Sequence, residues 1–370
     1  MGLSIGPITV DPPVVLAPMA GVTNAAFRRL CRSYGAGLYV SEMVSARAVV
    51  EGNERTKMRA SFADDEPVRS LQLYAVNPTT VGEAVRMVVD DGVQHVDLNM
   101  GCPSPKVMRR GGGAALPVHT RLVAAIVRSA VAAAGDVPVT VKTRMGVDDD
   151  TLTYLDTGRA AEDEGAAAIA LHARTAEQLY SGRADWSAIT TLKQHVTSIP
   201  VLGNGDVWDG RDALEMLAQT GADGVVVGRG CLGKPWLFRE LADVFAGRPV
   251  LPQPSLGEVA DVMRRHARLL VEAFAGEEGW ALRDFRKHVG WYLTGYPAGG
   301  EMRRRLGMVS SLAELDDLLS LLDPTAVLPP GHERLPRGHL SGPKQVTLPE
   351  GWRESRSSLL PPDELFVTGG

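Results

Sequence analysis

The sequence predicts a (β/α)8 TIM barrel followed by a small all-α helical-bundle domain. Eight short, β-branched apolar runs alternate with longer Ala-rich amphipathic stretches, which is the pattern of parallel strands joined by crossover helices. Eight repeats within roughly 230 residues fit a closed barrel better than an open doubly wound sheet. The runs are almost continuously apolar, as expected for strands that are covered on both faces.

The expected elements follow one another in regular order. Strands are expected at residues 14–17, 38–41, 68–73, 95–100, 138–142, 168–172, 200–203 and 224–228. Amphipathic helices between them include residues 24–34, 78–91, 119–134, 151–164, 186–195 and 209–220. We therefore assign the barrel to residues 1–248.

The strand–helix alternation breaks at residues 248–254, where three prolines indicate a linker. Ser255 can cap a helix that runs to about residue 275. Shorter helices are expected at 280–293, 301–308 and 312–322, so residues 255–323 form a helical domain. Residues 324–370 are rich in Pro and Gly, and we expect an extension that is disordered or docked through side chains such as Trp352.

Composition limits the class of protein. The net charge of −5 does not favour nucleic-acid binding, so any RNA site must be a local basic patch. The three cysteines, Cys31, Cys102 and Cys231, lack the spacing of a metal site or a disulfide framework. The N-terminus does not resemble a signal peptide, and no apolar run could span a bilayer. We expect a cytoplasmic monomer with no metal and no membrane partner.

Polar or glycine-rich groups follow every expected strand, at the barrel end where active sites lie. Cys102 follows the strand at 95–100, between Gly101 and Pro103, which shape the turn. A thiol there can give or take a proton above a ligand bound at the strand ends. The alternative is a small cysteine that only fills space.

Two glycine-rich turns suggest a phosphate site. Gly203–Asp206 and Gly228–Gly230 follow the last two strands, and Arg229 supplies a positive charge. Lys142 is open to three interpretations: an internal ion pair, a Schiff base as in barrel aldolases, or a cation against an electron-rich ring. His172 is either a second polar contact to that ring or a hydrogen-bonded core side chain.

Two further groups suit a flat heterocycle. Gln72 can donate and accept hydrogen bonds at an imide edge. The Pro18-Met19-Ala20 segment can lie beneath the ring. Together with the phosphate turns, these residues fit flavin mononucleotide (FMN).

Several motifs resemble those of the tRNA-dihydrouridine synthases, most of all the bacterial B subgroup. They are APMAGVTNAAFR, SEM, DLNMGCP with KVMRRGGGAAL, VKTRMG, LHARTAEQLYSGRADW, GNGD, VGRG and KHVGWYL, between about residues 14 and 322. The resemblance implies reduction of the C5–C6 double bond of uridines in tRNA, with FMN as cofactor and NADPH as reductant. A hydride would pass from reduced FMN to C6, and a proton from Cys102 to C5.

The resemblance also assigns roles to individual residues. Cys102 would be the catalytic acid, and Asn99, Arg144 and Tyr180 would contact the uridine. The residues implied in FMN binding are Pro18, Met19, Ala20, Gln72, Lys142, His172, Asn204, Gly205, Asp206, Gly228 and Arg229.

Clusters of basic residues are candidate tRNA contacts. They are Arg109-Arg110, the run 264–268, Arg283, the run 286–288 and the run 303–305. If the arginines share one face, the helical domain 255–323 can bind RNA phosphates. The alternative is that they are ordinary solvated helix faces balanced by nearby acids.

Three competing functions remain open from the residues. The first is an FMN-dependent barrel oxidoreductase that acts on a free metabolite such as a pyrimidine. The second is a Schiff-base aldolase built on Lys142. The third is a non-catalytic tRNA-binding protein with a vestigial barrel.

Overall fold

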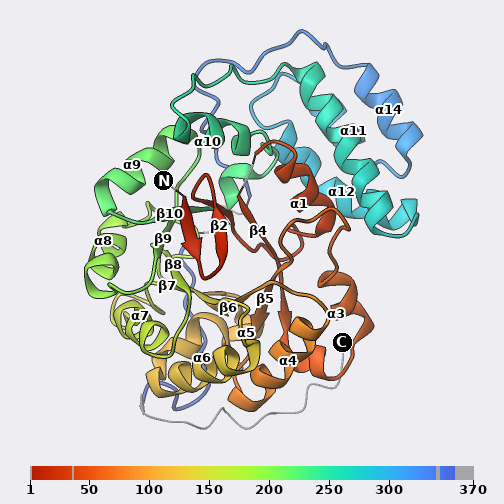
Figure 1. The fold of residues 1–370 in the computed structure, drawn as a ribbon. Coiled ribbons are helices and arrows are strands. Elements are labelled where there is room, and N and C mark those ends of the chain that lie inside the picture. The colour runs from red at the N-terminus through yellow and green to blue at the C-terminus, as the bar shows by residue number, and fades with distance from the viewer. Residues whose placement is uncertain (1, 36, 339–341, 355–370) are drawn as a thin grey trace.

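The computed structural model describes residues 2–35, 37–338 and 342–354, and it confirms the predicted (β/α)8 barrel. Eight parallel strands close in the order β10-β3-β4-β5-β6-β7-β8-β9 (Figure 1). Their bounds are β3 Val14–Leu16, β4 Leu38–Ser45, β5 Ser70–Tyr74, β6 His95–Met100, β7 Val139–Arg144, β8 Ala168–His172, β9 Val201–Asn204 and β10 Gly224–Val227.

Strand β4 is longer than predicted. The expected strand stops at Ser41 because polar residues follow it, yet β4 continues to Ser45. A register shift between Val40 and Met43 lets the bulged strand stay paired with β5 as far as Tyr74.

The predicted crossover helices are present with shifted ends. They are α1 Ala25–Arg32, α4 Pro78–Asp90, α6 Thr120–Ala134, α7 Tyr154–Asp163, α8 Trp186–His195 and α9 Gly210–Thr220. Helix α9 begins with a capping box between Asp209 and Asp212 and ends at Gly221, whose φ of 70° suits glycine. Short elements that were not predicted are α2 Ala46–Val50, α3 Glu54–Arg59, α5 Pro105–Met108, η1 Gly113–Val118, η2 Arg229–Cys231 and α10 Leu237–Phe245.

A hairpin that was not predicted covers the amino end of the barrel. Strands β1 (Leu3–Ile5) and β2 (Ile8–Val10) pair antiparallel, in front of the barrel axis in Figure 1. Leu3, Ile5 and Val10 pack against inward-facing barrel residues such as Val15 and Leu38. The hairpin closes this end, so a ligand enters the barrel from the carboxyl ends of the strands.

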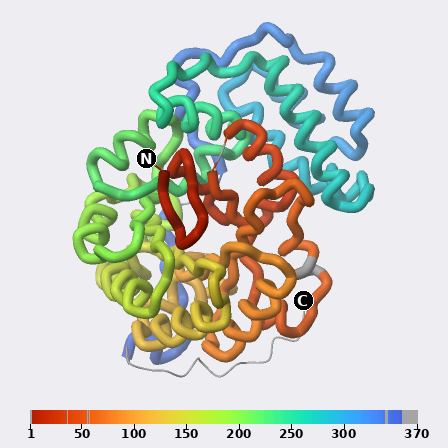
Figure 2. The backbone as a smooth tube through the Cα atoms, in the orientation of Figure 1, coloured from red at the N-terminus to blue at the C-terminus, as the bar shows by residue number. Residues whose placement is uncertain are grey.

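Four helices form a second body on one side of the barrel, coloured from teal to blue in Figure 2. They are α11 Leu256–Ala273, α12 Glu278–Tyr292, α13 Gly300–Leu306 and α14 Leu312–Ser320. Ser255 forms a capping box with Glu258 at the start of α11. The core of this body includes Phe285 and extends to Leu30 of α1, so the helices pack directly on the barrel.

Two histidines within the predicted basic runs do not face solvent. His266 and His288 are fully buried, with ring centroids 4.5 Å apart. The helical repeat points both side chains toward the apolar core, while Arg265 and Arg268 remain exposed. Burial lowers the pKa of His266 to about 3. These two side chains therefore cannot contribute to an RNA-binding face.

The segment after the helical body lies on the barrel. Arg334 pairs with Asp209 and Asp212, and Trp352 is 6% exposed. Residues 339–341 and 355–370 of the predicted extension lie outside the described residues. Among the helices that the structure describes, none is long and apolar enough to cross a membrane.

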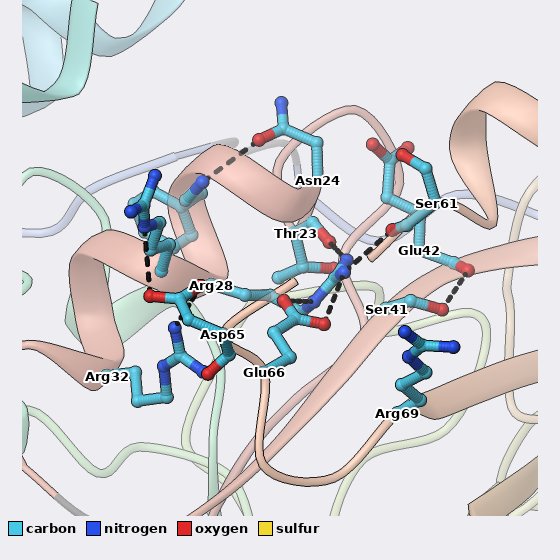
Figure 3. A network of polar contacts seen from close by, with 12 residues as sticks. Thr23, Asn24, Arg28, Arg32, Ser41, Glu42, Ser61, Asp65, Glu66 and Arg69 are labelled. Carbon is cyan, nitrogen blue, oxygen red and sulfur yellow. Dashed lines mark hydrogen bonds and ion pairs between the residues drawn. The ribbon is translucent and has the colours of Figure 1, made fainter. Parts of the chain in front are cut away.

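A buried ion pair anchors the loop that follows β3 (Figure 3). The Arg28 guanidinium donates to the Glu66 carboxylate at 2.9 and 3.0 Å, and to the carbonyls of Thr23 and Ser61. The Thr23 hydroxyl in turn accepts from Met19 N at 3.0 Å. The backbone of the Pro18-Met19-Ala20 segment is therefore held through Arg28.

We predict that Arg28→Ala lowers the free energy of unfolding by about 3–5 kcal/mol, because it leaves the Glu66 carboxylate buried without its partner. Arg29→Ala is the matched control on the same helix, since Arg29 is 40% exposed and its pairs with Asp65 and Glu272 lie in solvent. Its cost should stay below about 1 kcal/mol. Urea denaturation measures both, and equal losses would contradict the anchoring role of Arg28.

Candidate active site at the carboxyl ends of the strands

The ammonium group of Lys142 lies inside the barrel mouth, on β7. Its Nζ donates to Asn204 Oδ1 at 2.9 Å, and Asn204 Nδ2 donates to the Val226 carbonyl at 2.7 Å. Burial, and secondarily the charge of Arg144, lowers the pKa of Lys142 to about 8. The cation is thus oriented and poorly solvated, two properties that favour contact with an anion.

Four cations surround His172 at the end of β8. Burial lowers the pKa of His172 well below its ordinary value, and Arg144, Lys142, Arg174 and Arg229 lower it further. The imidazole is therefore neutral at physiological pH. The same positive potential that keeps His172 neutral makes this part of the mouth a favourable place for a negatively charged ligand.

The turn after β9 packs closely on its neighbours and lies beside an unsatisfied donor. Gly205 has a φ of 132°, and a Cβ there would lie 2.7 Å from Ala184 Cβ. Arg174 Nη1 is buried without a hydrogen-bond partner and lies 3.8 Å from the same position. A buried guanidinium N–H without a partner is costly, so this donor indicates a place for an anionic oxygen.

Asp206 holds the arginines. Its carboxylate accepts two hydrogen bonds from Arg174 Nη2 at 2.8 Å and one from Ala184 N at 2.7 Å, and it lies 3.7 Å from Arg229. The Arg229 guanidinium carbon lies 4.4 Å from the ring centre of Tyr180 and 5.3 Å from that of Trp208. Asp206, predicted as a cofactor contact, orients the groups that face the ligand.

A chain of hydrogen bonds leads from the barrel interior to Cys102. Thr140 Oγ1 and Gln72 Nε2 donate to the two oxygens of Asp97, at 2.6 and 2.7 Å. Asn99 Nδ2 donates to Gln72 Oε1 at 2.8 Å, and the Cys102 backbone N–H donates to Asn99 Oδ1 at 2.9 Å. The network fixes the amide groups of Gln72 and Asn99 and the start of the Cys102 loop.

The Cys102 thiol differs from the other two cysteines. It is half-buried at the barrel mouth, whereas Cys31 and Cys231 are fully buried. Burial raises the pKa of Cys102, although a backbone hydrogen bond at Ser104 and the charge of Arg144 oppose the rise. The thiol is therefore protonated at neutral pH, which suits a proton donor and not a thiolate nucleophile.

Arg144 braces the loops around the site. Its Nε donates to the Gly101 carbonyl at 3.1 Å, and its Nη1 donates to the carbonyls of Thr175 and Leu179 at 2.8 Å. The guanidinium carbon lies 5.4 Å from the Tyr180 ring centre. Arg144 and Tyr180, both predicted to contact a uridine, are thus neighbours, and Arg144 connects the loops after β6 and β8.

The loop after β3 completes the mouth. A Cβ on Gly228 would lie 3.7 Å from Ala17 Cβ and 4.0 Å from Met19 Sδ, so the ends of β3 and β10 adjoin. Pro18 and Lys142 line the same small cavity inside the barrel, and Ala20 is exposed. The structure therefore places the predicted site residues at or just after the carboxyl ends of the barrel strands.

An open groove of about 1020 Å³ extends from this opening. Its walls include Arg174, Tyr180, Trp208, Arg229 and, from the C-terminal segment, Arg334. Arg174 and Trp208 were assigned no role from the sequence, although Arg174 stands within the quoted motif LHARTAEQ. Within the described ranges, no three His, Cys, Asp or Glu side chains gather in a way that could hold a metal ion.

The fold and the site define a (β/α)8-barrel enzyme with a cation-rich pocket and a protonated cysteine at its rim. The family model described as dihydrouridine synthase (Dus) matches residues 15–326. The chain belongs to this family, which confirms the resemblance found in its motifs.

Individual relatives agree with this assignment. A probable tRNA-dihydrouridine synthase of Mycobacterium tuberculosis is 54% identical over 378 residues, covering 100% of this chain and 95% of that protein. A tRNA-dihydrouridine synthase B of Xanthomonas campestris is 41% identical over 301 residues, covering 81% of this chain and 90% of that protein. Histamine dehydrogenase from Rhizobium sp. 4-9 shares the fold, with a TM-score of 0.53 at 11% identity over 87% of this chain and 64% of that one.

Proposed function

We propose that this protein reduces the C5–C6 double bond of uridines in tRNA to 5,6-dihydrouridine, with FMN as cofactor and NADPH as reductant, as a cytoplasmic monomer. Family membership and the names of its relatives support the reaction and the tRNA substrate. The single observation that carries the proposal is the pairing of a protonated, half-buried Cys102 with a cation-rich pocket in the same barrel mouth.

The residues present fit FMN. At the glycine turns after β9 and β10, Arg174 Nη1 and Arg229 would supply hydrogen-bond donors and positive charge to a phosphate. Gln72, His172 and Lys142 would face the ring, with Asn204 orienting the lysine, and Pro18-Met19-Ala20 would lie along it. When bound and reduced, FMN supplies the hydride that adds to C6 of uracil.

Lys142 stabilises negative charge in this arrangement. Its ammonium is held by Asn204 and is poorly solvated. It would therefore stabilise negative charge at the edge of a bound ring more strongly than a solvated lysine would. Asp206 keeps Arg174 and Arg229 oriented at the phosphate end. The charges are therefore in place before the ligand binds.

Cys102 supplies the proton. Its Sγ–H donates to C5 of uracil as negative charge develops there, and the raised pKa keeps the thiol protonated beforehand. Asn99 and Tyr180 would contact the base, and Arg144 braces the loops that carry Cys102 and Tyr180. A uridine in a folded tRNA must leave its stack to reach this mouth.

We assign tRNA binding to the helical domain, residues 255–323. Arg265, Arg268, Arg283, Arg304 and Arg305 are exposed on it. Arg268 pairs with Asp316 and Arg304 with Glu301, both in solvent, where such pairs are weak and can be exchanged for phosphates. Arg283 lies 5.3 Å from the ring centre of Trp280, which is itself exposed and offers a stacking surface.

The competing functions are less well supported. An oxidoreductase for a free metabolite has no use for the exposed arginines of the helical domain. The lowered pKa of Lys142 would also suit a Schiff base, but its Nζ is already bonded to Asn204. A vestigial barrel would not need to keep the network from Thr140 to Cys102.

Cys102→Ala should lower kcat for unmodified tRNA by about 10²–10⁴-fold, the usual range for loss of a general acid. FMN content and reduction of the flavin by NADPH should not change, because the thiol lies at the substrate side. Cys31→Ala is the control, since Cys31 is buried in the core. Quantifying dihydrouridine by mass spectrometry measures the effect, and full turnover by Cys102→Ala would exclude the thiol as the acid.

FMN affinity should fall as pH rises through about 8, because the Lys142 ammonium that favours the anion loses its proton there. Binding is measured on the apoprotein by quenching of flavin fluorescence between pH 7 and about 9. Lys142→Met should bind FMN more weakly and without this pH dependence. The same pH profile in Lys142→Met and wild type would show that another group is responsible.

Reversing both Arg304 and Arg305 to Glu should weaken tRNA binding by about tenfold or more at low salt and flatten its salt dependence. FMN occupancy should stay as in wild type. The control reverses Arg86 and Arg121, which are exposed on α4 and α6 and carry the same change in charge. Equal losses in the two variants would mean that net charge, and not this face, governs binding.

A further inference from the structure

The C-terminal strap, residues 342–354, lies across the active-site loops. It follows residue 326, where the match to the family model ends, and the Mycobacterium tuberculosis relative covers it. Its described contacts fall on three successive loops, those after β6, β7 and β8. These loops carry Cys102, the Arg144 turn and Tyr180.

Trp352 is the main anchor of the strap on the Cys102 loop. Its indole Nε1 donates to the Ala115 carbonyl at 2.8 Å, and its ring centre lies 4.1 Å from that of His119, edge to face. It packs in a buried cluster with Met108 and Val118. A tryptophan that buries its ring and satisfies its N–H in one place is a strong local constraint.

The constraint reaches Cys102 through two glycines. Ala114 N donates to the Cys102 carbonyl at 3.1 Å. A Cβ on Gly113 would lie 2.3 Å from that carbonyl, and one on Gly111 would lie 2.5 Å from the Trp352 ring. Both glycines have positive φ, 57° and 74°. The loop is therefore packed tightly between Trp352 and Cys102, and a shift of one displaces the other.

The rest of the strap holds the two neighbouring loops. Lys344 N donates to the Glu177 carbonyl at 3.0 Å in the loop after β8, and Arg353 pairs with Asp148 after β7. Val346 and Leu348 pack on the same cluster as Trp352. Because Arg144 Nε also bonds the Gly101 carbonyl, the three loops and the strap form one connected unit.

We propose that Trp352 is a positioning residue for Cys102: it holds the glycine-rich loop so that the thiol faces the place of the uracil ring. This inference rests on the proposed function for its catalytic consequence. The step affected is the transfer of the Sγ proton to C5, as the hydride from the reductant forms the new C6–H bond. A displacement of about 1 Å at a reacting group can cost 10²-fold in rate.

The experiment compares full-length wild type with Trp352→Ala, Trp352→Phe and the control Lys344→Ala, whose side chain is exposed on the strap. The first readout is the rate at which iodoacetamide alkylates Cys102, resolved by mass spectrometry of its peptide. Cys31 and Cys231 are 0% exposed, so their protection reports that each variant is folded. This readout needs no tRNA and no turnover.

Iodoacetamide should alkylate Cys102 about tenfold faster in Trp352→Ala than in wild type, because the loop around the thiol opens more often. Its kcat for tRNA should fall by about 10²-fold with KM for tRNA unchanged. Trp352→Phe keeps the packing but loses the hydrogen bond to Ala115. Its alkylation rate and its kcat should therefore lie between those of wild type and Trp352→Ala. Lys344→Ala should match wild type in both readouts.

Wild-type alkylation in both Trp352 variants, or a loss confined to KM for tRNA, would overturn the positioning role. If Trp352→Ala also exposes Cys31 and Cys231, it has unfolded, and Trp352→Phe then carries the test. A wild-type enzyme that never reduces tRNA would contradict the proposed function alone, since the alkylation rates still decide whether Trp352 holds the Cys102 loop.

Discussion

Four buried or half-buried cations, Lys142, Arg144, Arg174 and Arg229, share the mouth of this barrel around one neutral histidine. Like charges removed from water raise the energy of the folded state unless partners compensate them. Asn204, Asp206 and backbone carbonyls supply part of that compensation. The Arg174 Nη1 donor has no partner, and in the proposed complex the phosphate of the cofactor would supply one.

The other half of the mouth has a different chemistry. The chain from Thr140 through Asp97, Gln72 and Asn99 ends at the Cys102 backbone, and burial keeps its thiol protonated. Closing the barrel places this proton source beside the cation-rich half. In the proposed reaction the arrangement would separate two tasks: the cations would hold a negatively charged reductant, and Cys102 would deliver a proton to the carbon next to the reduced one.

Much of the fold and part of the candidate site could be predicted from local sequence patterns. The bounds of β6 and β8 match the prediction, although only β8, with the sequence AIALH, is nearly continuous in apolar residues, whereas β6, HVDLNM, alternates polar and apolar ones. Arg174 received no role because its partner, Asp206, lies 32 residues away and only the closed barrel brings them together. The β1–β2 hairpin was missed because its strands have only three residues each. The docking of Trp352 depends on a contact 237 residues distant, which no local pattern encodes.

The measurement that tests the central claim most directly is the visible spectrum of the purified protein, taken before and after NADPH and then unmodified tRNA. The account predicts a yellow protein that bleaches with NADPH and regains its colour with tRNA, while dihydrouridine appears in the RNA. A protein that remains colourless and takes up no added FMN would contradict it, because the cation-rich pocket would then hold some other anion.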